Sequence, residues 1–412
     1  MYNIDLLSRI ITNSNLPVKL QNGVLLVNVN TLIKKRQKII EEMRDAENSN
    51  DIIPFVTGYE IEQIMNIIAS AEKKYRNMKF AVKIIFPEVE FIDKLTYVFF
   101  ECICYYLIEE KRHPVYIGMR CADRIQTRGI KSSPLLLLQT GRKEDNYKYI
   151  SKFAFDLYGY HYRRIIKGIG KERTNFLGQY GQEIDSFLKP FGISEGCRDK
   201  VVLVCTELAG NSIEHALAEC LIDIDVAPGY KKVLEDGNYD DNFYYGINIA
   251  IVNFSDILLG DGIEKNILSV SNPIPTQRYL KVAETFQKHQ LLFDEQYTRV
   301  DFCNVTAFQN KISGRREIDE TGGTGLPNLI KSLQEMSDTY RCYVISGDRC
   351  INFFKDTMGY SKDGWIGFND SNDYFSDKPN ADICSECLIY MPGTAYNLNF
   401  VIQGVEIEYE KD

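Results

Sequence analysis

One helical stretch constrains this chain more than any other part of it. DKVVLVCTELAGNSIEHALAE, residues 199–219, carries apolar side chains at helical spacing. Glu207 and Asn211 interrupt the apolar pattern and, being four residues apart, share one face of the expected helix. A helix that only packs into a core needs no such pair, whereas two oxygens one turn apart suit a hard cation such as Mg²⁺. We therefore expect Glu207 and Asn211 to be metal ligands beside a phosphate group.

A glycine-rich segment follows more than a hundred residues later. DETGGTGLPNLIKSLQEMS, residues 319–337, predicts an amphipathic helix over 326–336 that opens after three glycines. Glycines let the backbone approach a ligand closely, and a helix N-terminus offers free N–H groups to an anion. The segment is thus a candidate phosphate cradle. Its glycines are Gly322, Gly323 and Gly325.

The order of these two blocks resembles the GHKL ATPase superfamily, which includes gyrase-type topoisomerases, MutL-type repair proteins, histidine kinases and anti-sigma kinases. The stretch VVLVCTELAGNSIEHA is closest to the anti-sigma-type kinases. MPGTAYNLNFVI, residues 391–402, looks like the family's closing strand. The resemblance covers about residues 190–405. It implies an ATP-binding domain over 189–412, an α+β sandwich with a mixed sheet and helices on one face.

The resemblance also implies roles for individual residues. Glu207 would activate water or organise the site, and Asn211 would ligate Mg²⁺, so the implied cofactors are ATP and Mg²⁺. His215 lies beside the site, and we interpret it as a packed or capping histidine. The implied nucleotide-binding residues are Asn211, Glu214, Asn253, Ser255, Gly322, Gly323, Thr324, Gly325, Leu326 and Thr394.

The base-binding part of the pattern departs from the family. Asn253 stands where the family has an adenine-reading aspartate; its amide oxygen can accept a hydrogen bond but carries no charge. Ser255 replaces the first glycine of the motif, and Asp256 and Asp261 remain alternative adenine readers. Pro327 replaces a glycine in the phosphate loop, at a position where the first turn of a helix tolerates proline.

The segment between the two blocks corresponds to the family's lid. It runs from Asn266 to Thr321 and includes Arg315 and Arg316, which are candidates to contact a γ-phosphate. A polar, turn-rich insertion, Ser361–Cys387, separates the last two expected strands. We interpret this insertion as a surface loop.

The first half of the chain predicts a smaller α/β domain over residues 1–150. A strand at 79–86, a long apolar helix at 91–112 and a strand at 114–119 favour a parallel pair with a right-handed crossover. The stretch VEFIDKLTYVFF faintly resembles a STAS-type domain, which implies sensing or partner binding. Residues 151–188 are interpreted as a helical connector.

Composition limits the partners. The formal net charge of -9 disfavours nucleic acid and anionic membranes, and no apolar run approaches the ~20 residues of a membrane-spanning helix. Eleven cysteines without a secretion signal favour reduced thiols in the cytoplasm. Cys384 and Cys387 form one CSEC pair, but a structural zinc site needs a second pair or nearby histidines.

Three functions stay open. The first is an ATP-binding regulatory kinase of anti-sigma or histidine kinase type, for which His161 is the one upstream phospho-acceptor candidate. The second is an ATP-driven conformational switch with a protein partner or a homodimer. The third is a degenerate interaction module without ATP turnover. No Ser/His/Asp or Cys/His arrangement supports hydrolytic nucleophilic chemistry.

Overall fold

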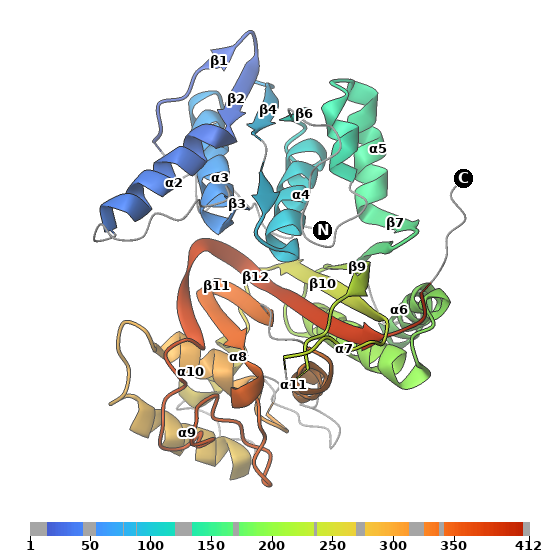
Figure 1. Ribbon diagram of the computed structural model, residues 1–412. Coiled ribbons are helices and arrows are strands. Elements are labelled where there is room, and N and C mark those ends of the chain that lie inside the picture. The colour runs from blue at the N-terminus through green and yellow to red at the C-terminus, as the bar shows by residue number, and fades with distance from the viewer. Residues whose placement is uncertain are drawn as a thin grey trace. The chain divides into compact units, whose positions relative to one another are not determined.

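The computed structural model (Figure 1) describes residues 15–43, 55–76, 78–87, 89–119, 134–167, 173–234, 237–268, 277–312, 325–337 and 342–406. The chain divides into two compact units, Tyr2–Ile165 and Ile166–Asp412. Both units combine helices with sheets, so the predicted α+β class is confirmed.

The Tyr2–Ile165 unit is built on a four-stranded sheet of order β1-β2-β4-β6. Its strands β2, β4 and β6 are parallel, and β1 is antiparallel to β2. The predicted parallel strand–helix–strand unit is therefore confirmed as β4, α4 and β6. These strands are β1 (Leu20–Gln21), β2 (Val24–Asn28), β4 (Ala81–Phe86) and β6 (Val115–Met119).

The helices of this unit surround a core to which α4 contributes most. The Asp93 side chain caps α4 by accepting a hydrogen bond from the Thr96 amide at 2.9 Å. The helix is buried along almost its whole length, and burial raises the pKa of its Cys104 thiol. The remaining elements are α2 (Val29–Met43), α3 (Gly58–Lys74), α4 (Lys94–Glu109), α5 (Lys143–Ala154), the 3-10 helix η1 (Pro134–Gln139) and the short parallel strands β3 (Phe55–Val56) and β5 (Glu90–Phe91).

The predicted helical connector over 151–188 is wrong in its first half. Strands β7 (Phe155–Tyr158) and β8 (His161–Ile166) form an antiparallel hairpin there. Gly159, with φ of 54°, makes the turn between them. Arg163 on β8 forms a buried ion pair with Glu101 on α4, and this tertiary contact was not visible in the local pattern. Within the described part of 151–188, the end of α5 and α6 (Arg173–Leu188) are helical as predicted.

The Ile166–Asp412 unit contains four neighbouring strands in the order β11-β12-β10-β9. All three ladders between them are antiparallel. Alternate residues of the central strands face a buried layer, as with Ile247, Ile249 and Ile251 on β10. The strands are β9 (Cys220–Tyr230), β10 (Tyr244–Phe254), β11 (Cys342–Phe353) and β12 (Cys384–Gln403).

Helices α7 (Glu195–Glu214) and α11 (Gly325–Met336) lie on one face of this sheet (Figure 1). Helix α7 packs on β9 and β10, α11 packs on β12, and the two helices contact each other. Helix α6 packs on α7 and continues into the 3-10 helix η2 (Lys189–Phe191). The apolar side of α7 therefore points to the sheet, with Val201, Val204 and Leu208 buried.

The predicted lid and the predicted surface loop form one packed body. Residues 277–312, which contain α9 (Gln277–His289) and α10 (Arg299–Thr306), pack against residues 354–383, and we call these two segments the aromatic module. Trp365 is 3% exposed and stacks on Tyr374 with ring centroids 5.2 Å apart. The Gln309 side chain bonds both the N–H and the carbonyl of Ile366, at 2.8 and 2.9 Å. The surface-loop interpretation is wrong because aromatic residues among the polar ones complete a core with α9 and α10.

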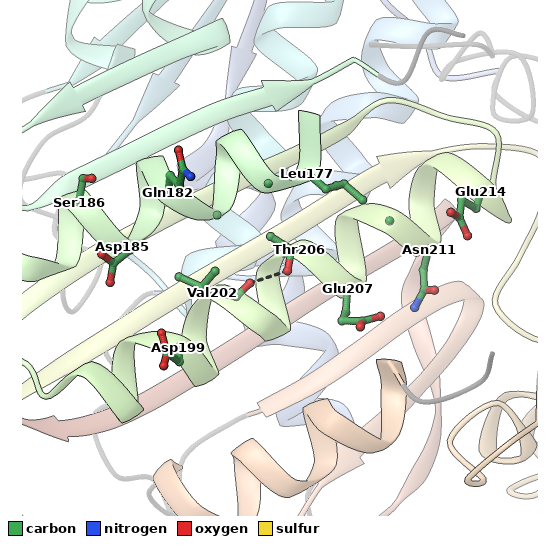
Figure 2. Close-up of a pocket in the computed structure, with 13 residues that line it drawn as sticks. Leu177, Gln182, Asp185, Ser186, Asp199, Val202, Thr206, Glu207, Asn211 and Glu214 are labelled. Atoms are coloured by element: carbon green, nitrogen blue, oxygen red, sulfur yellow. Dashed lines mark hydrogen bonds between the residues drawn. The ribbon is translucent and has the colours of Figure 1, made fainter. Parts of the chain in front are cut away.

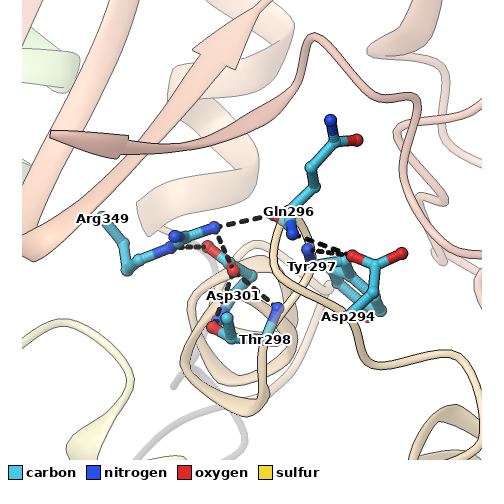
Figure 3. Close-up of polar contacts among 6 residues, drawn as sticks. All are labelled: Asp294, Gln296, Tyr297, Thr298, Asp301 and Arg349. Atoms are coloured by element: carbon cyan, nitrogen blue, oxygen red, sulfur yellow. Dashed lines mark hydrogen bonds and ion pairs between the residues drawn. The ribbon is translucent and has the colours of Figure 1, made fainter.

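One buried ion pair ties the aromatic module to the sheet (Figure 3). Arg349 on β11 donates from Nε to Asp301 Oδ1 on α10 at 2.8 Å, and its Nη2 lies 2.6 Å from Oδ2. Asp301 is also the third residue of a capping box with Thr298 at the start of α10. The same carboxylate thus caps the helix and neutralises the arginine. The short helix α8 (Asp261–Leu268) packs against α9 and α10, and η3 (Lys355–Thr357) follows β11.

Candidate functional site

A groove of about 730 Å³ runs between α6 and α7. Glycines let these helices approach closely, since a Cβ at Gly181 would lie 3.1 Å from Val202 Cγ1 and one at Gly210 would lie 3.5 Å from Leu177 Cδ1. The lining residues are Leu177, Gly178, Gly181, Gln182, Asp185, Ser186, Asp199, Val202, Thr206, Glu207, Gly210, Asn211 and Glu214.

The structure brings three of the predicted site residues together in this groove. Glu207 and Asn211 project from the same side of α7 (Figure 2), and Glu214 follows one turn later. The helical spacing produces this alignment, because residues four and seven apart return to one face. Glu207 and Asn211 are half-buried, and Glu214 is exposed. Glu207 and Asn211 can offer their oxygens to one hard cation.

Helix α11 places its N-terminus beside the same part of α7. An ion pair between Lys200 and Glu335 joins the two helices. Only the residues from Glu195 to Asp199 precede Lys200 in α7, so α11 must pack along the longer part that leads to Asn211. At ~1.5 Å per residue, Gly325 lies about 15 Å from Glu335 and Asn211 lies about 17 Å from Lys200. In the antiparallel packing that this ion pair and the contact between the two helices indicate, the free N–H groups of α11 lie level with Asn211.

The predicted phosphate loop is only partly described. Gly322, Gly323 and Thr324 lie outside the described residues, as do Arg315 and Arg316. Gly325 is the first residue of α11, and Leu326 is half-buried in its first turn. Pro327 is buried in the same turn, where its missing N–H has no intrahelical partner.

The residues predicted to read the base form a separate buried cluster. Asn253 donates from Nδ2 to Ser212 Oγ on α7 at 2.9 Å, and its Oδ1 accepts the Thr394 amide at 3.2 Å. Ser255 donates to the Ala216 carbonyl at 2.6 Å. Asn253, Ser255 and Thr394 are 4%, 5% and 6% exposed. They join the end of α7 to β10 and β12, and none of them is among the residues that line the groove.

Backbone geometry fixes this cluster. Gly393 precedes Thr394 with φ of +105°, and a Cβ there would lie 2.4 Å from the Asn253 carbonyl oxygen. Only glycine allows β12 to approach β10 so closely at this point. The alternative adenine readers lie elsewhere: Asp256 is exposed, and Asp261 begins α8 and accepts the Leu258 amide at 2.8 Å.

The described lining of the groove is acidic. It contains Asp185, Asp199, Glu207 and Glu214 and neither lysine nor arginine. Asp185 is paired with Arg198 at 2.6 Å. The α6 residues Gln182, Asp185 and Ser186 were missed in the sequence because no motif marks them; the two glycines of α6 were the available signal. An anionic ligand needs a metal ion to bind beside these carboxylates.

Burial changes the titration of two groups on α7. It raises the pKa of Glu207, and it lowers the pKa of His215, which favours the neutral imidazole. The His215 backbone N–H donates to the Asn211 carbonyl at 2.9 Å at the C-terminal end of the helix. The capping position predicted for His215 is therefore the one it occupies.

The raised pKa of Glu207 predicts a pH-dependent loss of stability. The folded state holds a proton on Glu207 in a pH range where the unfolded chain has released it, so this contribution is lost as the pH rises above the ordinary glutamate range. Urea unfolding from about pH 4 to about pH 8 should show Glu207→Gln gaining stability over wild type as the pH rises. Glu284→Gln, at an exposed position on α9, is the control. A constant difference between wild type and Glu207→Gln would contradict the prediction.

Comparisons with known proteins leave the family open. No protein-family model matches the chain, and no solved structure is similar to it. The chain is 24% identical to an alanine–tRNA ligase of Wigglesworthia glossinidia brevipalpis over 200 residues, which is 48% of this chain and 20% of the ligase. Because so little of the ligase is covered, its activity is not carried over. No helix in the described parts of the chain is long and apolar enough to cross a membrane.

Proposed function

We propose that the Ile166–Asp412 unit binds ATP with Mg²⁺ beside α7. One observation carries the proposal: Glu207 and Asn211 line a groove on α7 level with the N-terminus of α11. A carboxylate and an amide oxygen suit Mg²⁺, and the free N–H groups of a helix N-terminus suit phosphate. The packing of α7 and α11 on one face of a sheet is consistent with the GHKL resemblance.

Each residue has a distinct role in this proposal. Asn211 ligates Mg²⁺, and the metal offsets the repulsion between the phosphates and the acidic lining. Glu207 orients the attacking water and accepts its proton as the bond from the γ-phosphate to the bridging oxygen breaks, which gives ADP and phosphate. Its raised pKa brings it closer to the neutral range in which a general base works best.

We propose that nucleotide binding serves regulation, as a switch or as a protein kinase of the anti-sigma type. In this proposal the Tyr2–Ile165 unit binds the protein partner, in line with its faint STAS resemblance. As a histidine phospho-acceptor, His161 is disfavoured. It is 2% exposed, and its Nδ1 lies 3.0 Å from Asp156 Oδ2.

Titration calorimetry of ATP with and without Mg²⁺ tests the proposal. Wild type should bind ATP only with Mg²⁺, and Asn211→Ala should weaken binding by at least about tenfold because the metal loses a ligand. Gln182→Ala is the matched control, since it removes an amide from the α6 side of the same groove (Figure 2). Absence of binding by folded wild type would exclude the ATP site. Equal losses in both variants would exclude the role of Asn211.

A second function, an interaction module without ATP turnover, is favoured by the buried cluster. Asn253 uses both ends of its amide within the protein, so a base at this position would first have to break a hydrogen bond. If calorimetry detects no ATP binding by the folded protein, the interaction module becomes the proposed function in place of the ATP-binding one.

A further inference from the structure

Two cysteines of neighbouring strands face each other at the base of the aromatic module. On the β11–β12 ladder Cys350 lies opposite Ser385, and Arg349 lies opposite Glu386. Cys387 is two residues beyond Ser385, so it projects from the same face of the sheet as Cys350 and is its diagonal neighbour. The side chains of diagonal neighbours are within reach of each other.

Hydrogen bonding to the neighbouring Cys387 side chain and burial both raise the pKa of the Cys350 thiol. Cys350 is 8% exposed, whereas Cys387 is only half-buried, so an oxidant in solution reaches Cys387 first. Both are free thiols.

Cys384, the other cysteine of the CSEC motif, faces the opposite side. It pairs with Ile351, which places it on the same face as Arg349 and next to the Asp301 ion pair. The motif therefore does not act as a unit. Each of its cysteines has different neighbours, and the partner of Cys387 comes from the adjacent strand.

The ladder is irregular next to this pair. Its register shifts between Gly347 and Arg349, so that several residues of β12 after Cys387 lie beside Asp348 alone. Such an irregularity lets the backbone adjust locally. A disulfide needs a sulfur–sulfur distance of about 2.05 Å, and a local adjustment at Cys387 can supply the final approach.

We propose that Cys350 and Cys387 are a reversible oxidation site for a peroxide-class oxidant. The Cys387 thiolate attacks a peroxide oxygen, the O–O bond breaks, and the products are Cys387 sulfenic acid and water or an alcohol. The Cys350 sulfur then attacks the Cys387 sulfur, its proton leaves with the departing hydroxyl as water, and the disulfide forms. An external thiol reverses the reaction by exchange.

The disulfide would close a loop around residues 351–386, which include the 354–383 segment of the aromatic module. Cross-linking the ends of a loop restricts the unfolded chain more than the folded one. Oxidation should therefore make the Ile166–Asp412 unit more resistant to heat. This inference does not depend on ATP binding.

Peptide mapping without reductant after hydrogen peroxide treatment of the folded full chain tests the proposal. The expected product is a Cys350–Cys387 linked peptide that lacks two hydrogens and disappears on adding dithiothreitol. The midpoint of thermal unfolding should rise by roughly 5 °C in the oxidised protein. Cys387→Ser should abolish both effects, and Cys384→Ser, the matched control in the same motif, should retain them.

Two results would overturn the proposal. One is a Cys384–Cys387 link, or a Cys350–Cys387 link that forms only in denaturant. The other is over-oxidation of Cys387 to sulfinic acid without any link to Cys350. Circular dichroism of both serine variants shows that they are folded before oxidation, so that a missing link is not mistaken for unfolding.

Discussion

Replacing Asp301 with alanine should lower the free energy of unfolding of the Ile166–Asp412 unit by about 3–5 kcal/mol. The Asp301 side chain is fully buried and the Arg349 side chain is 6% exposed, so the variant leaves a guanidinium without its carboxylate in a dry interior. The variant also loses the hydrogen bonds that the Asp301 carboxylate accepts from the backbone N–H and hydroxyl of Thr298, at 2.8 and 2.7 Å. Both losses act on the contact between α10 and β11.

Urea unfolding followed by tryptophan fluorescence measures this effect, because Trp365 is the single tryptophan and lies inside the aromatic module. Asp294→Ala is the matched control: Asp294 also accepts backbone N–H groups, but its ion pair with Lys378 is exposed, so this variant should lose far less stability than Asp301→Ala. A loss below about 1.5 kcal/mol for Asp301→Ala would contradict the burial argument.

Replacing Asn253 with alanine should lower the free energy of unfolding by about 2–4 kcal/mol. The variant leaves the buried Thr394 N–H without its acceptor and removes the hydrogen bond to Ser212. It also leaves a cavity between α7, β10 and β12. Asn248→Ala is the control, since Asn248 lies on the same strand at a half-buried position. Urea unfolding of both variants provides the comparison.

The same variant separates the two proposed functions of the cluster. If Asn253 reads a base, Asn253→Ala should weaken ATP binding well beyond what Asn248→Ala does. If the cluster only holds α7 to the sheet, the two variants should bind ATP alike under conditions in which both are folded. An Asn253→Ala variant as stable as Asn248→Ala would show that the hydrogen bonds contribute little.

The local sequence pattern predicted those helices and strands whose buried apolar residues recur at regular spacing. Helix α7 and the strand–helix–strand unit around α4 have regular apolar spacing; both were predicted with the correct type, and β4 and β6 are parallel as predicted. The position of Glu207 and Asn211 on the same side of α7 also follows from helical spacing alone. The N-terminus of α11 was predicted from its glycines and lies within a residue of the expected start.

Other features depend on contacts between distant residues. Nothing near Trp365 in the sequence shows that its ring contacts Arg278 of α9, so Ser361–Cys387 was interpreted as a polar surface loop. An arginine at position 163 is typical of an exposed helix. Its burial is explained only by the contact with Glu101, which lies 62 residues earlier in the chain. Asn253 matched the position of a base-reading residue, but its side-chain amide is already hydrogen-bonded to Ser212 and Thr394.

The aromatic module has a consequence for synthesis of the chain. Its halves, residues 277–312 and 354–383, are separated by α11 and β11, so a ribosome completes α10 well before it adds Tyr374. At typical elongation rates the delay from residue 306 to residue 383 is roughly 4–15 s. Until Tyr374 is added, Phe302 lacks the ring that stacks on it in the native protein, and the nascent chain exposes this aromatic surface to other molecules.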